Sequence, residues 1–218
     1  MQTSGSMISK LHTLTKLEIR PEHFAYLSIQ KGDVNRFAND PLSWEFAFRA
    51  VLEDALRSLL PVLPDQCDSI LDIGAGLGTI DLFLYRLYGG KVEKIALLDG
   101  ENDPPEVVKS DRTFSNHAVS RDYLTLNGLP ETVLNYYSPT NLPSSKFNLI
   151  MSFASWCFHY EPNTYMDMVL ECCTPETLLV VDLRKGSAEW LRQIEAHFNP
   201  VGSLKMTPKF ERIAFRLK

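Results

Sequence analysis

A glycine-rich turn that follows Asp72, together with Asp99 at the end of the next apolar run, is the part of this sequence best suited to chemistry. Residues 70–78 read Ile-Leu-Asp-Ile-Gly-Ala-Gly-Leu-Gly, so an apolar run that includes Asp72 ends in three glycines. Glycine removes the Cβ that would keep a ligand from the backbone, and a helix behind the turn would offer unpaired N–H groups. A second apolar run, residues 94–98, ends at Asp99 and Gly100. The pattern predicts a ligand site at the carboxyl edge of a parallel sheet.

The spacing of the glycines distinguishes between classes of cofactor. Sites for nicotinamide and flavin dinucleotides use Gly-x-Gly-x-x-Gly, or alanine in the last place, whereas this chain has Gly-x-Gly-x-Gly and Thr79 in that place. The Asp72 carboxylate would fit poorly beside a pyrophosphate, but it suits the ammonium group of a methionine moiety, directly or through water. Asp99 lies where an acidic residue can accept hydrogen bonds from both ribose hydroxyls. Dinucleotide binding and a tight turn without a ligand stay open as alternatives.

Strands and helices alternate along the chain around these residues. We expect strands over residues 69–73, 94–98, 132–137, 147–153 and 177–183. We expect helices over residues 41–60, 79–88, 162–173 and 187–198, with helical material within 105–127. Such alternation implies parallel pairing through right-handed crossovers. Only three residues separate 201–206 from 210–217, too few for a crossover helix, so we expect these last two strands to form an antiparallel hairpin.

These features together resemble the class I S-adenosylmethionine-dependent methyltransferases. The resemblance rests on LDIGAGLG, on LLDG, on a strand that runs into SFASWCFHY and on the terminal hairpin, and it covers roughly residues 65–218. It implies an α/β fold with a Rossmann-like seven-stranded sheet, mostly parallel with one antiparallel strand, in the order 3-2-1-4-5-7-6 with helices on both faces. It also implies S-adenosyl-L-methionine as the cofactor. The cofactor-binding residues expected from it are Asp72, Gly74, Ala75, Gly76, Gly78, Asp99, Gly100, Ser138 and Ser152.

The family's adenine contact usually follows the third strand. Tyr136, Tyr137 and Ser138 occupy that region, without the acidic residue that is common there. A tyrosine could stack on the base or could be a half-buried strand residue. The adenine contact is therefore left open.

The segment after the fourth strand, residues 152–162, would lie beside the transferred methyl group. It lacks the Asn/Asp-Pro-Pro-aromatic signature of methyltransferases that act on DNA bases or glutamine, and Asp103-Pro104-Pro105 follows the second strand instead. His159 is the candidate general base, because imidazole titrates near neutrality; it could equally cap the next helix or pack in the wall. Serines at 152 and 155 replace the carboxylates that a metal-dependent enzyme would need, so no metal site is expected.

Three further residues are candidate contacts for the methyl acceptor. Trp156 and Tyr160 could line an apolar wall or belong to the core, and Arg184 could hold a polar or anionic group or lie in a solvated loop. SWCFHY, followed by PNTY and later DLR, loosely resembles bacterial sugar O-methyltransferases. We therefore expect methyl transfer to a hydroxyl oxygen of a small polar molecule such as a sugar. RNA or protein methylation, an oxidoreductase and a non-catalytic S-adenosylmethionine-binding protein are the alternatives.

Composition sets broader limits. The chain has 218 residues, a formal net charge of −5 and four cysteines without a Cys-x-x-Cys pair. The acidic balance disfavours a duplex nucleic-acid partner, and no apolar run is long enough for a membrane helix. We expect a cytoplasmic protein with reduced thiols and a small-molecule partner. The sequence does not indicate the oligomeric state. We expect residues 1–7 to be a tag or disordered terminus, 8–64 a helical segment or lid over the cofactor, and 65–218 the catalytic domain.

Overall fold

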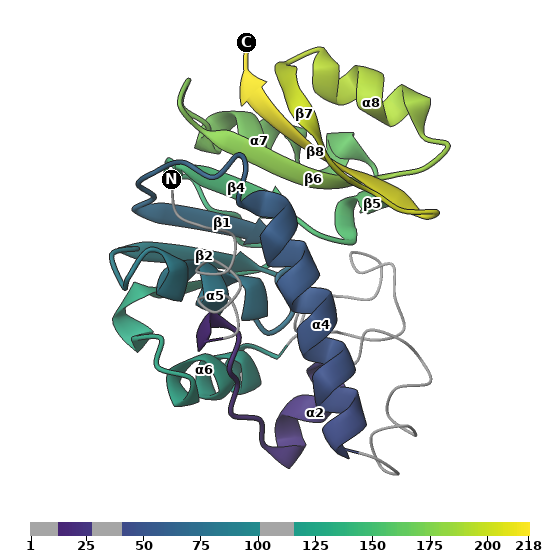
Figure 1. The fold of residues 1–218 in the computed structure, drawn as a ribbon. Coiled ribbons are helices and arrows are strands. Elements are labelled where there is room, and N and C mark those ends of the chain that lie inside the picture. Colours follow the sequence, from purple (N-terminus) through teal and green to yellow (C-terminus); the bar gives the residue numbers. More distant parts are fainter. Residues whose placement is uncertain (1–12, 28–40, 101–115) are drawn as a thin grey trace.

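A seven-stranded sheet forms the centre of the molecule (Figure 1). The computed structural model describes residues 13–27, 41–100 and 116–218, with the side chains of 24, 25 and 41–44 excepted. The strands lie in the order β3-β2-β1-β4-β6-β8-β7. They span β1 Ser69–Ile73, β2 Lys94–Leu98, β3 Leu134–Tyr137, β4 Leu149–Ser152, β6 Leu178–Arg184, β7 Phe198–Met206 and β8 Phe210–Leu217.

The pairing of the strands confirms the expected topology. The pairs β3–β2, β2–β1, β1–β4 and β4–β6 are parallel, whereas β8 runs antiparallel to both β6 and β7. An additional strand, β5 (Ser155–Tyr160), lies outside this sheet and was not expected from the sequence. With β5 set aside, the order is the predicted 3-2-1-4-5-7-6. Strand β4 ends at Ser152 because the chain there turns through residues 153–154 into β5.

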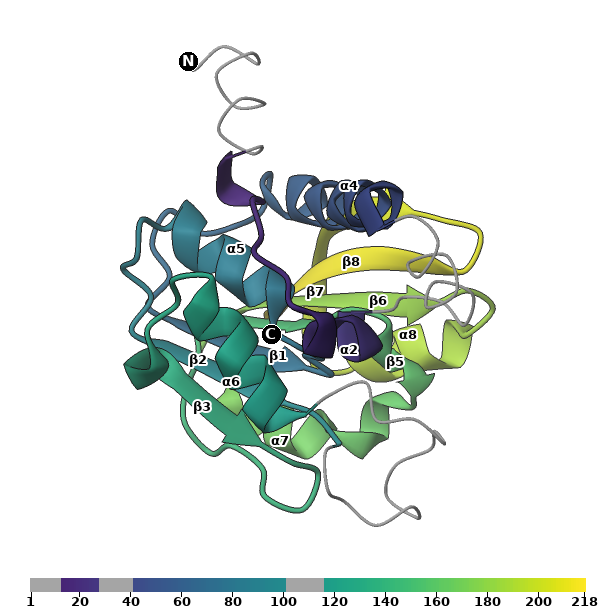
Figure 2. The same cartoon turned by 90° about the horizontal axis from the view of Figure 1, so that it is seen from below.

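Helices cover both faces of the sheet. Figure 2 shows α4 and α5 on one side and α7 and α8 on the other. The helices are α2 Phe24–Leu27, α4 Pro41–Leu59, α5 Thr79–Leu87, α6 His117–Leu126, α7 Met166–Cys172 and α8 Ala188–Glu195, with single 3₁₀ turns η1 Pro21–His23, η2 Glu131–Val133 and η3 Pro162–Thr164. The one helix expected over 162–173 is divided into η3 and α7, because Tyr165 leaves helical geometry at φ −129°. The part of the expected helix at 105–115 lies outside the described residues.

Two hydrophobic cores result from the alternation of side chains along each strand. On β1, Ile70 packs with α4, α5 and α6, whereas Leu71 and Ile73 pack with α7 and α8. Asp72 shares the parity of Ile70 and therefore faces the side of α5. This orientation decides which groups surround the Asp72 carboxyl.

Residues 13–27 lie against α5 and α6. Arg86 donates hydrogen bonds to the carbonyl oxygens of Leu14 and Lys16 at 2.9 and 2.6 Å. The Asn127 side chain bonds both backbone groups of Glu18, at 2.7 and 2.8 Å. This part of the N-terminal segment is thus fastened to the domain. No described helix is long and apolar enough to cross a membrane.

Candidate functional site

The turn between β1 and α5 is built on three glycines in the left-handed region. Gly74, Gly76 and Gly78 have φ values of +81°, +57° and +75°. The Gly74 N–H donates to the Leu98 carbonyl oxygen at 2.7 Å, which ties the turn to the end of β2. A Cβ on Gly74 would lie 2.0 Å from Ser155 Oγ, so this glycine makes room for β5. Glycine is therefore required at position 74 so that the turn can pack against β5.

Asp99 joins the glycine turn to the loop after β2. Its Oδ2 accepts the Gly76 N–H at 2.7 Å, and its Oδ1 accepts the Gly100 N–H at 2.7 Å. The Asp99 N–H in turn donates to the Tyr137 carbonyl oxygen at 3.2 Å, which connects β3. Each carboxylate oxygen has a second lone pair, so the carboxylate can hold the turn and still accept hydrogen bonds from a ligand.

A pair of buried carboxyls lies behind the turn. Asp72 on β1 is 5% exposed and Asp81, in the first turn of α5, has no exposed surface. Asp72 Oδ1 and both Asp81 oxygens receive no hydrogen bond from a donor on another described residue. Burial raises the pKa of Asp72 to about 7, and it raises the pKa of Asp81 well above the ordinary value, with the Asp72 charge adding to that rise. Asp81 was not predicted as a site residue, although an acidic residue inside the apolar run Ile80–Leu84 indicates a buried carboxyl.

An ion pair lies on the same face of the sheet. Asp182 on β6 and Arg212 on β8 are register partners, and the guanidinium bonds both carboxylate oxygens at 2.7 and 2.9 Å. The two side chains are 1% and 3% exposed. Arg212 also bonds Ser58 Oγ of α4 at 2.9 Å and lies over the Phe153 ring at 3.7 Å. Asp182 therefore holds the guanidinium with which Arg212 joins α4 to the sheet.

The segment from β4 to β5 is held in unusual backbone geometry. Ala154 and Cys157 have φ values of +52° and +66°, a region that non-glycine residues seldom adopt. Ser152 Oγ donates to the Ile73 carbonyl oxygen at 2.7 Å and accepts the Trp156 N–H at 2.9 Å. Backbone strain of this kind persists where the surroundings enforce it, often at functional sites.

Two expected contacts on this segment are buried instead. Ser152 has no exposed surface, and both hydrogen bonds of its hydroxyl are made within the protein. Trp156 is also fully buried, and its indole N–H donates to the Pro162 carbonyl oxygen at 2.9 Å. Neither side chain presents surface to a cofactor or an acceptor in this structure. Both shape the strand that carries His159.

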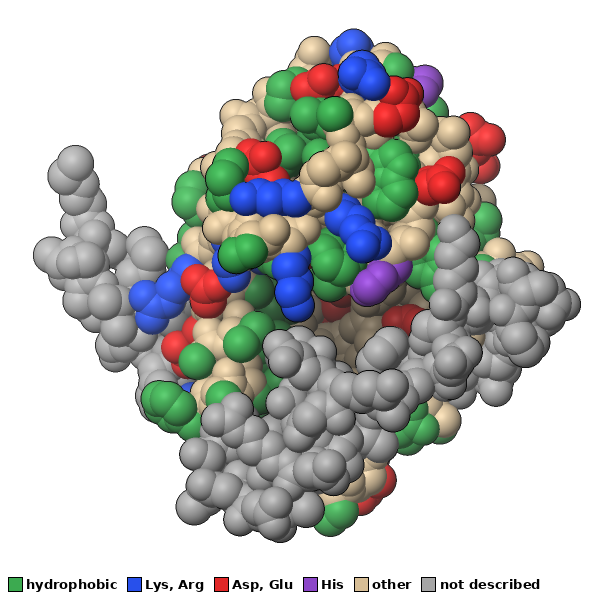
Figure 3. Space-filling view, turned by 90° about the vertical axis from the view of Figure 1, so that its right-hand side faces the viewer, with side chains coloured by type: hydrophobic (Ala, Val, Ile, Leu, Met, Phe, Trp, Pro, Cys, Tyr) green, Lys and Arg blue, Asp and Glu red, His purple; other side chains and the backbone are tan. Residues whose placement is uncertain are grey.

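His159 lies on the exposed part of β5. Its ring stands edge-on to Phe158 at 4.7 Å, and the Arg184 guanidinium lies 5.9 Å from the centre of the Phe158 ring. Partial burial and the Arg184 charge lower the pKa of His159, so its imidazole is mostly neutral at pH 7. Figure 3 shows a hollow on one face of the molecule, with a histidine and several Lys and Arg side chains above it and acidic side chains at its floor. Tyr160, half-buried, packs edge-on against Tyr165 at 6.4 Å.

The region expected to contact adenine is occupied by contacts within the protein. Ser138 Oγ bonds Thr140 Oγ1 at 3.0 Å on the exposed turn after β3. The Tyr136 ring lies 4.9 Å from the His117 ring and 5.1 Å from the Arg121 guanidinium. The geometry therefore assigns neither residue to a base.

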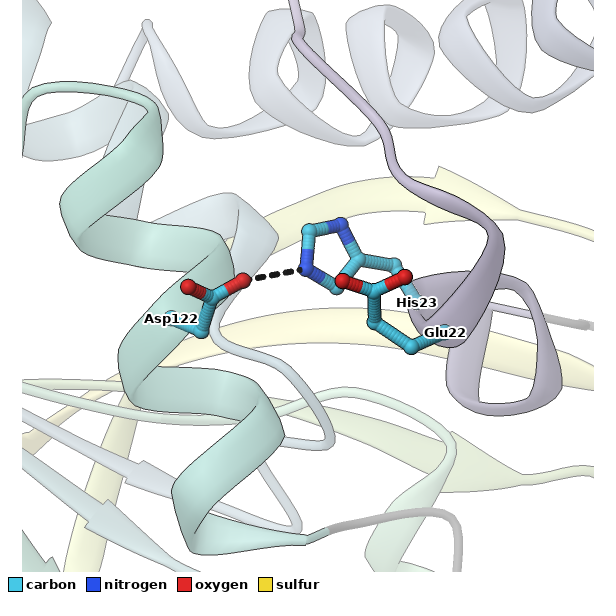
Figure 4. A group of neighbouring side chains, drawn as sticks. All are labelled: Glu22, His23 and Asp122. Carbon is cyan, nitrogen blue, oxygen red and sulfur yellow. Dashed lines mark hydrogen bonds and ion pairs between the residues drawn. The ribbon is translucent and has the colours of Figure 1, made fainter.

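Within the part of the chain that the structure describes, one group outside this site has the composition of a metal site. Glu22, His23 and Asp122 have ligand atoms within 4.8 Å of one another (Figure 4). His23 Nδ1 accepts the Arg20 N–H at 3.0 Å, so the proton of the neutral ring is on Nε2, which lies 3.0 Å from Asp122 Oδ2. A metal on Nε2 would require an imidazolate, whereas ligating histidines normally donate from the other nitrogen. The group instead fastens η1 to α6, with Arg20 also bonding Asp122 at 3.0 Å.

Comparisons with solved structures place the fold. The chain is similar to the PH0226 protein from Pyrococcus horikoshii OT3 (TM-score 0.59, 14% identity, 82% of this chain and 94% of that one). It is similar to a TehB-like SAM-dependent methyltransferase from Corynebacterium glutamicum (TM-score 0.51, 16% identity, 76% and 88%). It is also similar to PigF with SAH (TM-score 0.51, 18% identity, 98% and 82%). The fold is that of class I methyltransferases.

The comparisons leave the acceptor open. Other similar structures include a ribosomal protein L11 methylase from Lactobacillus delbrueckii and a tRNA methyltransferase from B. subtilis. The sequence matches no protein-family model and no curated protein.

Proposed function

We propose that this protein is an S-adenosylmethionine-dependent methyltransferase. The observation that carries the proposal is the Asp72 carboxyl, which is 5% exposed and lies beside a turn of three left-handed glycines, with Oδ1 receiving no hydrogen bond from any other described residue. A buried acceptor without a donor is costly, and a cationic ligand group would satisfy it. A pyrophosphate at the same turn would instead be repelled by this carboxyl.

Different residues would contact different parts of the cofactor. Asp72 would receive the ammonium group of the methionine moiety, and Asp99 would accept hydrogen bonds from the ribose hydroxyls. The backbone of residues 74–78 and Gly100 would border the nucleoside. When bound, the cofactor supplies a methyl group that is electrophilic because it is attached to a sulfonium.

We propose a hydroxyl oxygen of a small polar molecule, such as a sugar, as the methyl acceptor. His159 would act as the general base, because its lowered pKa keeps the imidazole neutral and able to take a proton at pH 7. The Arg184 charge beside Phe158 favours an acceptor with polar or anionic groups. Transfer needs little more than alignment of the two reactants, which the positioned β5 segment would provide.

Calorimetric titration tests the cofactor. We expect binding of S-adenosylhomocysteine and no binding of NAD. The reverse result would make the protein an oxidoreductase. Binding of neither would remove the proposed function.

An acceptor screen with labelled methyl donor tests the chemistry. We expect transfer to saccharides or similar hydroxylated molecules, and transfer to RNA or protein alone would refute the proposed acceptor. His159→Ala should lower turnover at least about tenfold, the low end of a general base's contribution, with unchanged affinity for S-adenosylhomocysteine. His197→Ala, at an exposed position after α8, is the matched control. Full activity of His159→Ala would mean that the base is another group or is not needed.

A further inference from the structure

The buried carboxyl of Asp81 is assigned neither to the cofactor nor to the methyl acceptor. It lies in the first turn of α5, between the buried apolar residues Ile80 and Leu82, and its side chain has no exposed surface. Both of its oxygens lack a donor on another described residue, and so does Asp72 Oδ1. The two carboxyls can form a hydrogen bond with each other only if one of them keeps a proton, because an ionised carboxylate accepts only.

Among the described residues, no cation is left to pair with these two carboxyls. Asp99, after β2, adds a negative charge, and Arg212 on β8 adds a positive one. The Arg212 guanidinium, however, is already held by both oxygens of Asp182. Two ionised carboxylates in so dry a place would repel each other strongly, so the pair carries at most one negative charge near neutral pH.

The proton is assigned to Asp81, whose side chain has no exposed surface, whereas Asp72 is 5% exposed and lies next to the glycine turn. The pKa of Asp81 lies well above the ordinary value, because the side chain is buried and faces Asp72, whereas burial brings the pKa of Asp72 to about 7. The hydrogen bond from Asp81 lowers the pKa of Asp72 and so favours its ionised form. Asp72 is thus the carboxyl that changes its charge in the neutral range.

We propose that Asp81 stays protonated and donates a hydrogen bond to Asp72, and that Asp72 releases a proton to solvent when the cofactor's ammonium group binds to its Oδ1. This inference rests on the proposed function and makes Asp81 a positioning residue. In this step the O–H bond of Asp72 breaks, the proton leaves to the buffer, and an ammonium N–H of the cofactor takes its place beside the carboxylate. Cofactor affinity is thereby linked to pH through the amino-acid end alone.

Calorimetry with two probes separates this inference from the proposed function. S-adenosylhomocysteine carries the ammonium group, whereas 5′-methylthioadenosine has the same nucleoside without it. Each is titrated into the full chain from pH 6 to pH 8, in buffers of different ionisation enthalpy, to count the protons released. With a pKa of about 7 for Asp72, S-adenosylhomocysteine should release about half a proton at pH 7 and bind up to about tenfold more tightly at pH 8 than at pH 6. The affinity for 5′-methylthioadenosine should stay constant.

Two variants of Asp81 test its role as a neutral donor. Asp81→Asn keeps a donor without a charge and should retain the wild-type pH profile. Asp81→Leu removes the donor, so the pH midpoint should move up; a shift of one pH unit would weaken S-adenosylhomocysteine binding about fivefold at pH 7. Glu189→Gln, on the exposed side of α8, is the control for loss of a carboxylate elsewhere.

The outcomes are distinct. If both probes bind and neither releases protons, the inference is wrong and the proposed function stands. A wild-type profile in Asp81→Leu, or loss of the pH dependence in Asp81→Asn, would also overturn it. Failure of both probes to bind the wild-type chain would remove the proposed function itself, and the inference with it.

Discussion

Replacing Arg212 with methionine should destabilise the protein strongly and in a pH-dependent manner. Arg212 and Asp182 are 3% and 1% exposed and joined by two hydrogen bonds of 2.7 and 2.9 Å. Methionine keeps an apolar side chain of similar length but leaves the Asp182 carboxylate buried without its cation. The variant must then keep an unpaired charge or protonate Asp182.

The free energy of protonating Asp182 sets the upper limit of the destabilisation. Moving a carboxyl from an ordinary pKa of about 3.9 to 7 costs about 4 kcal/mol at 1.36 kcal/mol per unit. We therefore expect a loss of about 3–4 kcal/mol in the free energy of unfolding at pH 7, within the range for breaking a buried pair.

The sign of the pH dependence follows from Asp182. Burial already raises its pKa in the folded protein, and loss of the Arg212 hydrogen bonds raises that pKa further. A folded-state pKa above the unfolded value means that the folded state binds the proton more readily. The protonated Asp182 carboxyl therefore stabilises the folded state at low pH, and this stabilisation is lost as the pH rises through the folded-state pKa of Asp182. The deficit of the variant should shrink to about 1–2 kcal/mol at pH 5.

Urea denaturation followed by circular dichroism at pH 7 and pH 5 measures this effect. The double variant Asp182→Leu with Arg212→Met should lie within about 1 kcal/mol of the wild type, because an apolar pair can replace a buried ion pair. Arg192→Met, which breaks only the exposed pair with Glu189, should change stability by less than about 0.5 kcal/mol. A deficit equal at both pH values, or a double variant as unstable as Arg212→Met, would refute the reasoning.

Three further predictions concern the turn, the ribose contact and the N-terminal fastening. Gly74→Ala should lower the free energy of unfolding by about 2 kcal/mol or more, because its methyl group would lie 2.0 Å from Ser155 Oγ at a φ of +81°; adding Ser155→Gly should recover part of the loss in thermal unfolding, and no recovery would contradict the contact. Asp99→Ala should weaken S-adenosylhomocysteine binding at least about tenfold in calorimetry, because hydrogen bonds to a charged group are worth about 1.5–3 kcal/mol each; unchanged affinity would remove the ribose assignment. Zinc should not raise the melting temperature, since both ring nitrogens of His23 are used in hydrogen bonds, and stabilisation that His23→Gln abolishes would show a metal site after all.

Much of the fold could be predicted from the sequence because its signals are local. Strands β1, β2 and β8 have the bounds that their apolar runs predict, and the short connection at 207–209 requires the terminal hairpin. The glycine spacing likewise predicts the turn at 74–78, because φ values above zero favour glycine wherever they occur. Strand β5 was missed because its backbone includes Cys157 at φ +66°, which no residue type in the segment indicates.

The candidate site was predicted in part. The placement of Asp99 on the glycine turn agrees with its expected position, since the carboxyl ends of neighbouring parallel strands meet at one edge. Ser152 and Trp156 were expected to contact ligands, but both are buried and donate hydrogen bonds to backbone carbonyl oxygens. The sequence of a strand does not indicate which of its polar side chains will bond the backbone in this way. Whether residues 8–64 cover the cofactor stays a prediction.

The sequence by itself determined the order of elements, the glycine turn and the two aspartates at the strand ends, since each depends on residues close together in the chain. Only the tertiary structure decided which charges are buried together. Asp81 approaches Asp72 because α5 packs on the face of the sheet that Asp72 shares with Ile70, and Arg212 pairs with Asp182 through the register of β6 and β8. Burial and pairing are properties of packed surfaces, so the protonation states on which the proposed chemistry depends are set by contacts between elements far apart in the chain.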